Sequence, residues 1–255
     1  MEKSDLEIEL RSLYDISSKH SQYQQLPTCL SSFLDLGNTT IKPTYERERL
    51  DFVLSKIDLG KDLLDIGGNS GFFSFEAIDH GVKSVDYWEG NTSHAKFVKL
   101  AAQAIGYDQR IKVYNDYFDF SRCDKHYDTI FLFNVIHHLG FDFSSGIDMH
   151  EAKALMINSL NNLAAHGNKM VFQMGFNWGG DTSRCLFTNG LKSEVIDFVS
   201  DGTKDYWIIE SIGIPELVND KYIYRDLTPE NSNRFDEFGE FLNRPLFIMK
   251  SKALN

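Results

Sequence analysis

An acidic residue and three closely spaced glycines form the first group in the sequence that could do chemistry. Segment 63–75 reads LLDIGGNSGFFSF, in which an apolar run leads through an acid and glycines into a second apolar run. This order predicts a buried strand, a tight turn and the start of a helix, which is a common site for nucleotide-like ligands. Glycine lets the backbone approach a ligand closely, and asparagine also tolerates a positive φ, which we expect at residue 69. The candidate ligand-binding residues of the turn are Asp65, Gly67, Gly68, Asn69 and Gly71.

Three ligand classes use such a turn: nucleoside triphosphates, NAD-type dinucleotides and S-adenosylmethionine. A P-loop requires a lysine followed by serine or threonine after its glycines, whereas two phenylalanines follow Gly71. The NAD fingerprint G-x-G-x-x-G fits poorly, because the glycines stand at 67, 68 and 71. The carboxylate of Asp65 would repel a pyrophosphate, but it can hold the water or the ammonium group around an amino-acid moiety. The turn therefore favours S-adenosylmethionine, with an NAD-dependent enzyme as an alternative.

Polar residues also follow the second, third and fourth expected strands. Glu89 lies 18 residues after Gly71 (89 − 71), a spacing at which a carboxylate can accept both hydroxyls of a ribose. Asp116 could accept the amine of an adenine, with Tyr117 as an apolar cover. Ligands of open α/β sheets sit outside the carboxyl ends of the strands, so the segment that begins at Asn134 is expected near the reacting end of the ligand.

Two adjacent histidines, His137 and His138, are the candidate catalytic residues of that segment. A neutral imidazole is a natural proton acceptor for a hydroxyl substrate near neutral pH. Either histidine could instead bond to backbone and shape the turn. No metal is expected, because adjacent histidines without a nearby carboxylate cluster have no standard ligand spacing.

Strand-like runs alternate with helical patterns from residue 61 onward, which predicts βαβ units. The expected strands are 63–66, 84–88, 110–115, 128–134, 169–176, 206–214 and 245–251, with a polar loop before the last. The expected helices are one from Phe72 and others at 45–58, 93–106, 149–165 and 191–199. The predicted fold is an α/β, Rossmann-like, mostly parallel seven-stranded sheet with helices on both faces. We expect residues 1–60 to form an N-terminal helical extension or lid, and residues 61–255 to form the ligand-binding domain.

Charge and composition restrict the partners. The formal net charge of −11 disfavours a broad nucleic-acid interface, which needs clustered Lys and Arg. No stretch is apolar enough to span a membrane, the N-terminus lacks a signal-peptide core, and the three cysteines form no CxxC pair. We therefore expect a cytoplasmic protein.

Together these residues resemble the class I S-adenosylmethionine-dependent methyltransferases. The resemblance rests on segment 65–71, Glu89, Asp116 and segment 127–138, and it covers roughly residues 60–176. The family's usual turn, D-x-G-x-G-x-G, has a glycine where this chain has Asn69. The resemblance implies S-adenosylmethionine as cofactor and S-adenosylhomocysteine as product.

The same resemblance implies roles for individual residues. It places Asp65 and Gly67 beside the methionine part of the cofactor, Glu89 on the ribose and Asp116 near the adenine. Asn134 would lie close to the methionine carboxylate or the sulfonium.

A narrower resemblance rests on the segments 49–51, 71–74 and 136–138. They look like the methyltransferase part of enzymes that cap bacterial O-antigen polysaccharide, and more loosely like the tRNA wobble-uridine carboxymethyltransferase group. The acidic charge favours the first.

We accordingly predict SN2 methyl transfer to a hydroxyl of a small molecule or a glycan, with one of the two histidines as the base. RNA (tRNA) or N-methylation, and a non-catalytic S-adenosylmethionine-binding protein, are the alternatives. Trp178 could stack on a sugar or anchor the core, and the apolar N-terminal helix could serve a homodimer. The candidate acceptor-binding residues are Tyr45, Arg49, Trp178, Asp181 and Arg184.

Overall fold

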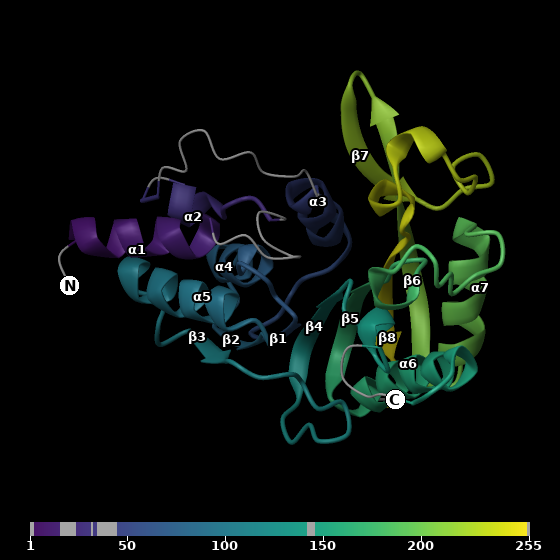
Figure 1. Ribbon diagram of the computed structural model, residues 1–255, viewed down its shortest axis with the longest axis horizontal. Helices are drawn as coiled ribbons and strands as arrows, with labels where there is room; N and C mark the ends of the chain where they lie inside the picture. The colour runs from purple at the N-terminus through teal and green to yellow at the C-terminus, as the bar shows by residue number, and fades with distance from the viewer. Residues whose placement is uncertain (1–2, 16–23, 32, 35–44, 142–145, 254–255) are drawn as a thin grey trace. The chain divides into compact units, whose positions relative to one another are not determined.

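The computed structural model describes residues 3–15, 24–31, 33–34, 45–141 and 146–253 (Figure 1). The chain divides into two compact units, and each is described by itself. The first unit comprises residues 1–50 and 58–118, and the second comprises residues 51–57 and 119–255.

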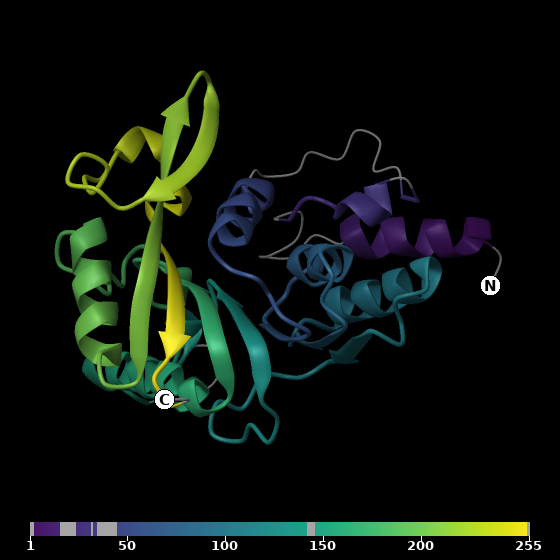
Figure 2. The ribbon, with the colours of Figure 1, turned by 180° about the vertical axis from the view of Figure 1, so that it is seen from behind.

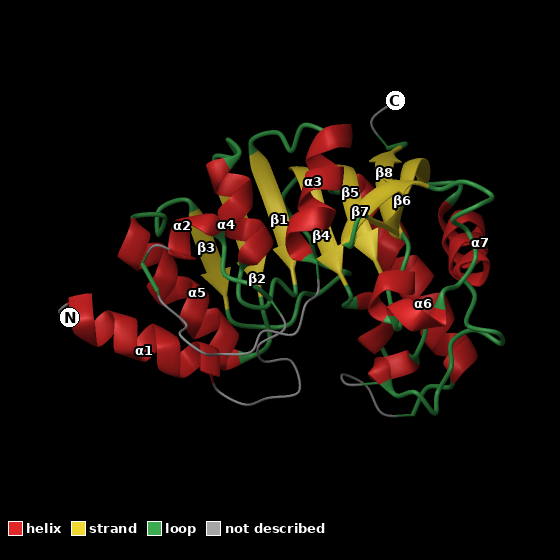
Figure 3. Cartoon of the chain, turned by 90° about the horizontal axis from the view of Figure 1, so that it is seen from above, coloured by secondary structure: helices red, strands yellow, loops and turns green. Residues whose placement is uncertain are grey.

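Three parallel strands form the centre of the first unit. They are β1 (Asp62–Ile66), β2 (Ser84–Trp88) and β3 (Ile111–Tyr114), in the order β3-β2-β1. Helices α4 (Phe72–Asp79) and α5 (Thr92–Ile105) connect them, and Figure 3 shows the three strands side by side. The carboxyl ends of β1 and β2 lie together, because Asp65 is paired with Tyr87 and Ile66 with Trp88.

Local signals set the ends of α5. The side chain of Asn91 accepts hydrogen bonds from the backbone N–H groups of Ser93 and His94, which caps the start of the helix. Gly106, in the left-handed conformation, ends it.

Helices α1 (Lys3–Asp15), α2 (Thr28–Ser31) and α3 (Glu46–Lys56) precede β1, so the expected helical character of the N-terminal region is confirmed. Tyr14 of α1 packs against Phe97 of α5, with ring centroids 5.8 Å apart. Residues 1–50, which include α1 and α2, belong to the first unit. The role of a lid stays a prediction.

The buried carboxylate of Glu76 joins α4 to α2 and to the start of α3 in the first unit. Glu76 of α4 accepts hydrogen bonds from the backbone N and the hydroxyl of Thr28 (2.6 and 2.8 Å) and from both terminal nitrogens of Arg47 (2.8 and 2.6 Å). Burial raises the pKa of Glu76, but the bonds from Arg47 and Thr28 outweigh it, so the pKa is lowered overall. Glu76 is therefore a charged anchor inside the first unit.

We expect Glu76→Gln to lower the free energy of unfolding by about 1–2 kcal/mol at pH 7, because the buried carboxylate of Glu76 accepts charge-assisted hydrogen bonds from the partly exposed guanidinium of Arg47. A carboxyl with a lowered pKa stabilises above its unfolded-state pKa and loses this effect as the pH falls, so the difference between variant and wild type should shrink below about pH 4. Urea denaturation at several pH values measures this difference in the free energy of unfolding. Glu9→Gln is the control, because Glu9 is only half-buried and pairs with the exposed Lys96, so its loss should change stability by less than about 0.5 kcal/mol. Equal effects of the two substitutions would contradict the assignment.

Five strands form the second unit, in the order β4-β5-β8-β6-β7. Strands β4 (Tyr127–Phe133) and β5 (Gly167–Gln173) are parallel, whereas β8 (Leu246–Ser251), β6 (Trp207–Val218) and β7 (Lys221–Asp226) each run antiparallel to the strand before them in that order. Helix α6 (Met149–Asn162) and the short helix Leu163–Ala165 connect β4 to β5, and α7 (Lys192–Thr203) precedes β6.

The expected mostly parallel sheet is confirmed in part, because β1, β2 and β3 pair in the parallel sense, as do β4 and β5, but the expected number of seven strands is wrong. The described residues hold eight strands, and β6, β7 and β8 pair only in the antiparallel sense. The additional strand is β7, which lies in the expected polar loop. Asn219 and Asp220 have φ values of 50° and 60°, which makes a tight hairpin turn between β6 and β7. Figure 2 shows this hairpin extending beyond β8.

No helix among the described residues is both long and apolar enough to cross a membrane.

Candidate functional site

The glycine-rich turn between β1 and α4 contains three residues in the left-handed region. Gly67, Asn69 and Gly71 have φ values of 69°, 53° and 83°. The expected positive φ of Asn69 is thus confirmed. The turn is closed by hydrogen bonds from Gly67 N to Trp88 O (2.8 Å) and from Gly71 N to Gly68 O (2.9 Å). The backbone of the turn is therefore bound to the end of β2.

Gly68 is required for a different reason, which is the lack of space beside it. A Cβ at this position would lie 2.4 Å from Cε2 of Tyr87 and 2.7 Å from Oδ2 of Asp65. Tyr87 is fully buried, and its hydroxyl donates a hydrogen bond to the carbonyl of Asn69. Tyr87 thus packs against the turn at Gly68 and is hydrogen-bonded to it at Asn69.

Asp65 is a buried carboxyl at the end of β1. It is 1% exposed, and its Oδ2 accepts a hydrogen bond of 2.6 Å from the hydroxyl of Ser74 on α4. Burial raises the pKa of Asp65 to about 7, and the negative charge of Glu89 contributes to the rise. A carboxyl with such a raised pKa ionises when a cationic ligand group approaches it, because the positive charge favours the carboxylate.

Glu89 joins the end of β2 to the turn. Its Oε2 accepts a hydrogen bond of 2.9 Å from the backbone N of Asn69, and its Oε1 accepts one of 2.7 Å from the backbone N of Asn91. Burial raises the pKa of Glu89 and these two bonds oppose the rise. A carboxylate has about four lone-pair positions, so the two bonds leave acceptor capacity for ligand hydroxyls.

The residues after β3 lie beside the Glu89 loop. The side chain of Asn115 donates to the carbonyl of Glu89 (3.0 Å), and the ring of Tyr117 lies against Gly90, where a Cβ would be only 2.1 Å from Cε1. Tyr117 is 59% exposed, and Asp116 is also exposed. The first unit therefore brings Asp65, the turn, Glu89 and Tyr117 together, while the adenine-binding role of Asp116 stays a prediction.

Tyr45 and Arg49 stand at the start of α3. Tyr45 has a φ of 57°, and the following residue, Glu46, pairs with Arg49 at 3.3 Å. Both members of the pair are 2% exposed, and burial raises the pKa of Glu46 to about 7. The guanidinium of Arg49 lies over the ring of Phe73, 5.0 Å from its centroid. Arg49 is therefore engaged inside the first unit, next to the start of α4.

In the second unit, Asn134 follows β4 with a φ of 59°. Its Oδ1 accepts a hydrogen bond of 2.9 Å from Arg244, and its Nδ2 donates to Gln173 (3.3 Å). Arg244 also pairs with Glu240 at 2.7 Å. These bonds fix the orientation of the Asn134 amide at the end of β4.

The two histidines differ in burial. His137 is 3% exposed, and its Nδ1 accepts a hydrogen bond of 3.1 Å from the backbone N of Gly175. An imidazole whose Nδ1 accepts carries its proton on Nε2 when it is neutral, and it then has no second nitrogen for a substrate proton. His138 is more exposed, and its ring lies 4.5 Å from that of His137. This geometry favours His138 as a base.

We expect neutral His137 to be the Nε2–H tautomer, in long-range ¹H–¹⁵N spectra recorded at pH 8. His80 provides an internal comparison, because its Nδ1 lies 2.8 Å from the carbonyl oxygen of Glu76 and must donate to it. The two residues should therefore show opposite tautomers. An Nδ1–H signal for His137 would contradict the hydrogen bond from Gly175, and His137 and His138 would then be equal candidates for the base.

Three further candidates lie after β5. Trp178 is 5% exposed, and its indole N–H donates to the carbonyl of Leu139 (2.8 Å). Of its two expected roles, this geometry favours the core anchor. Arg184 pairs with Asp181 at 3.6 Å and lies over the rings of Phe141 and Trp178. Arg184 is exposed and Asp181 is half-buried, and their contact with an acceptor stays a prediction.

In each unit, residues that support the candidate residues were not identified from the sequence. Ser74 and Tyr87 lie on the inner faces of α4 and β2, and their positions relative to the turn could have been recognised from the spacing. Arg244, Glu240 and Gln24 come from distant segments, and nothing in their local sequence marks them. The residues that were not identified are therefore Gln24, Ser74 and Tyr87 in the first unit, and Glu240 and Arg244 in the second.

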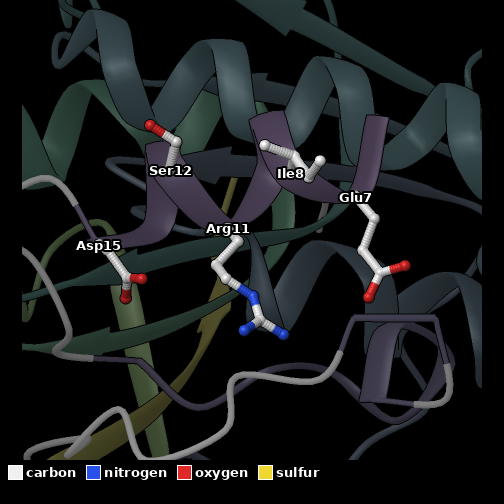
Figure 4. Close-up of a pocket in the computed structure, with 5 residues that line it drawn as sticks. All are labelled: Glu7, Ile8, Arg11, Ser12 and Asp15. Atoms are coloured by element: carbon white, nitrogen blue, oxygen red, sulfur yellow. The ribbon is translucent and has the colours of Figure 1, made fainter. Parts of the chain in front are cut away.

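A separate hollow of about 490 Å³ runs along α1, lined by Glu7, Ile8, Arg11, Ser12 and Asp15. Figure 4 shows Glu7, Arg11 and Asp15 pointing to one side of the helix. None of the candidate site residues lines this hollow. The described residues also contain no cluster of three or more side chains that could hold a metal ion.

No protein-family model and no curated protein matches the chain. Among solved structures, WbdD in complex with the kinase inhibitor LY294002 matches with a TM-score of 0.57 at 14% identity, over 94% of this chain and 47% of that one. This chain thus spans about half the length of WbdD. The PH0226 protein from Pyrococcus horikoshii OT3 matches with a TM-score of 0.50 at 12% identity, over 84% of this chain and 93% of that one.

A segment of StiE named as an O-MT matches with a TM-score of 0.48 at 15% identity, over 82% of this chain and 75% of that one. Proteins named as methylases or methyltransferases are also among the matches. At such identities the similarity to WbdD and to the PH0226 protein is one of fold, and it agrees with the resemblance that the sequence indicates.

Proposed function

We propose that the chain is an S-adenosylmethionine-dependent methyltransferase. One observation carries the proposal: a buried carboxyl, Asp65, and a half-buried one, Glu89, flank a turn whose backbone requires glycines and a left-handed asparagine. The similarity of fold to methyltransferases supports it.

The residues present fit this cofactor. The buried Asp65 carboxyl suits the ammonium group of the methionine part, and Glu89 suits the two ribose hydroxyls. Glycine at 67, 68 and 71 leaves the turn with few side chains, so that its backbone can lie close to the ligand. When bound, S-adenosylmethionine supplies a methyl group on a positively charged sulfur.

For the reaction, we propose O-methylation of a small molecule or a glycan. A hydroxyl acceptor must lose its proton as its oxygen bonds to carbon, and His138 is the residue proposed to take that proton. His137, Asn134 and Arg244 would hold the surrounding segment of the second unit in place. The net charge of −11 supports an acceptor other than RNA.

Calorimetric titration with S-adenosylhomocysteine, and then with NAD, tests the proposal. We expect micromolar binding of S-adenosylhomocysteine, and about tenfold or greater weakening in Glu89→Gln, which keeps the size of the side chain but removes the charge that the ribose hydroxyls favour. Glu9→Gln on α1 is the control and should bind as the wild type does. Binding of NAD without binding of S-adenosylhomocysteine would overturn the proposal, and so would an unchanged affinity in Glu89→Gln.

A further inference from the structure

The helix that follows the glycine-rich turn cannot cap its own first turn. Its N-terminal flanking residue is Gly71, which has no side chain to accept a hydrogen bond from the orphan N–H groups of α4. A larger residue is excluded there, because φ is 83° and a Cβ would lie 2.8 Å from Cγ2 of Val98. The acceptor must therefore come from another part of the chain.

Gln24 supplies this acceptor from 48 residues away in the sequence. Its Oε1 accepts hydrogen bonds from the backbone N of Phe72 (3.3 Å) and from the hydroxyl of Ser70 (3.1 Å). Ser70 is buried, and its backbone N donates to the side chain of Asn69 (2.8 Å). Gln24 thus holds the residues on both sides of Gly71.

Gln24 is itself held in place from two directions. The hydroxyl of Tyr14 donates to the backbone carbonyl of Gln24, and Tyr14 is buried against Phe97 of α5. The next residue, Gln25, donates its backbone N–H to the carboxyl of Glu46 on α3. The N-terminal region therefore reaches the glycine-rich turn through a constrained side chain.

We propose that Gln24 is a positioning residue of the cofactor site. By fixing Ser70 and the first N–H of α4, it sets the path of residues 68–70, whose backbone must lie against the ligand. This inference rests on the proposed function. Through the hydrogen bonds of Gln24, the N-terminal region then influences the affinity for the ligand.

A double-mutant cycle on S-adenosylhomocysteine affinity tests the inference, with Gln24→Met, Ser70→Ala and the double variant. Met has a similar length to Gln but accepts no comparable hydrogen bond. We expect Gln24→Met to weaken binding about tenfold. The double variant should bind at most about 20-fold more weakly than the wild type, because both changes remove one shared interaction. The neighbouring Gln25→Met is the matched control, with affinity within twofold of the wild type. Thermal melts establish that each variant is folded at the titration temperature.

Wild-type affinity in Gln24→Met would overturn the inference, as would fully additive losses in the double variant. A melting temperature that falls while the affinity stays constant would assign Gln24 a purely structural role and would likewise overturn it. Failure of the proposed function looks different: the wild type would then not bind S-adenosylhomocysteine, or Glu89→Gln would bind as tightly as the wild type.

Discussion

Asp65→Asn should weaken binding of S-adenosylhomocysteine by about 100-fold at pH 8 and should make the ligand-free protein more stable at that pH. The two effects have opposite signs because one carboxyl is responsible for both. It provides the negative charge for the ligand's ammonium group, a charge-assisted interaction whose loss removes about 1.5–3 kcal/mol. Without a ligand, the same charge is buried with the Ser74 hydroxyl as its hydrogen-bond donor.

The pH dependence of both effects follows from the pKa of about 7 that burial produces in Asp65. The raised pKa means that the native protein binds a proton more tightly than the unfolded chain. Stability of the ligand-free protein therefore falls as the pH rises from about 4 through 7, and Asp65→Asn removes this decline, a gain of about 1–3 kcal/mol at pH 8. Ligand affinity has the reverse trend, since the ionised form binds the cation: it should rise roughly 30-fold from pH 5.5 to 8. The raised pKa of Glu89 acts in the same direction.

Calorimetry and urea denaturation at pH 5.5, 7 and 8 measure these effects. Asp62→Asn is the control on the same strand, because Asp62 stands at the start of β1, at the opposite end from the turn. It should leave the ligand affinity within about twofold of the wild type. An Asp65→Asn variant that bound S-adenosylhomocysteine as the wild type does would show that the carboxylate does not hold the ligand.

Gly68→Ala should destabilise the first unit and abolish ligand binding. The new Cβ would lie 2.4 Å from Tyr87 and 2.7 Å from Asp65, and both residues are buried, so neither can move aside. Overpacking of this kind costs about 1–3 kcal/mol. Displacement of Tyr87 would also disturb its bond to the Asn69 carbonyl, so we expect binding of S-adenosylhomocysteine to be lost as well.

Gly90→Ala is the matched control for stability. Its Cβ would be even closer to a tyrosine, 2.1 Å from Cε1 of Tyr117, but that side chain is 59% exposed and can rotate into solvent. Its free energy of unfolding should change by less than about 0.5 kcal/mol. Urea denaturation of both variants measures the contrast. Equal destabilisation would show that burial of the displaced ring does not decide the effect.

Some features of the site follow from short-range physics and could be predicted from the sequence. Strand β2 covers the expected 84–88 range, and α4 starts at the expected Phe72, because apolar runs and glycine breaks act locally. The positive φ of Asn69 was predictable for the same reason, since few residues tolerate it. The parallel pairing of β1 and β2, together with the 18-residue spacing, accounts for the proximity of Glu89 to the turn.

Other features were mispredicted although a local signal was present. The β6–β7 hairpin turns at Asn219 and Asp220, a residue pair that favours positive φ, yet the charged and aromatic strand after it was taken for a loop. Because that strand contains charges of both signs, its sequence shows no clear alternation of apolar and polar residues. Strand propensity depends on the neighbour that a strand pairs with, and the sequence of one strand does not show that neighbour.

The turn, the two acids and the order of strands and helices around them follow from local sequence, because sterics and apolar periodicity act over a few residues. The tertiary structure alone decided the burial of Asp65 and His137, and with it the pKa of one and the tautomer expected for the other. It also decided which distant residues serve the site: Gln24 reaches Phe72 across 48 positions, and Arg244 reaches Asn134 across 110. Such hydrogen bonds depend on how separate elements pack, and residue spacing carries no record of that packing.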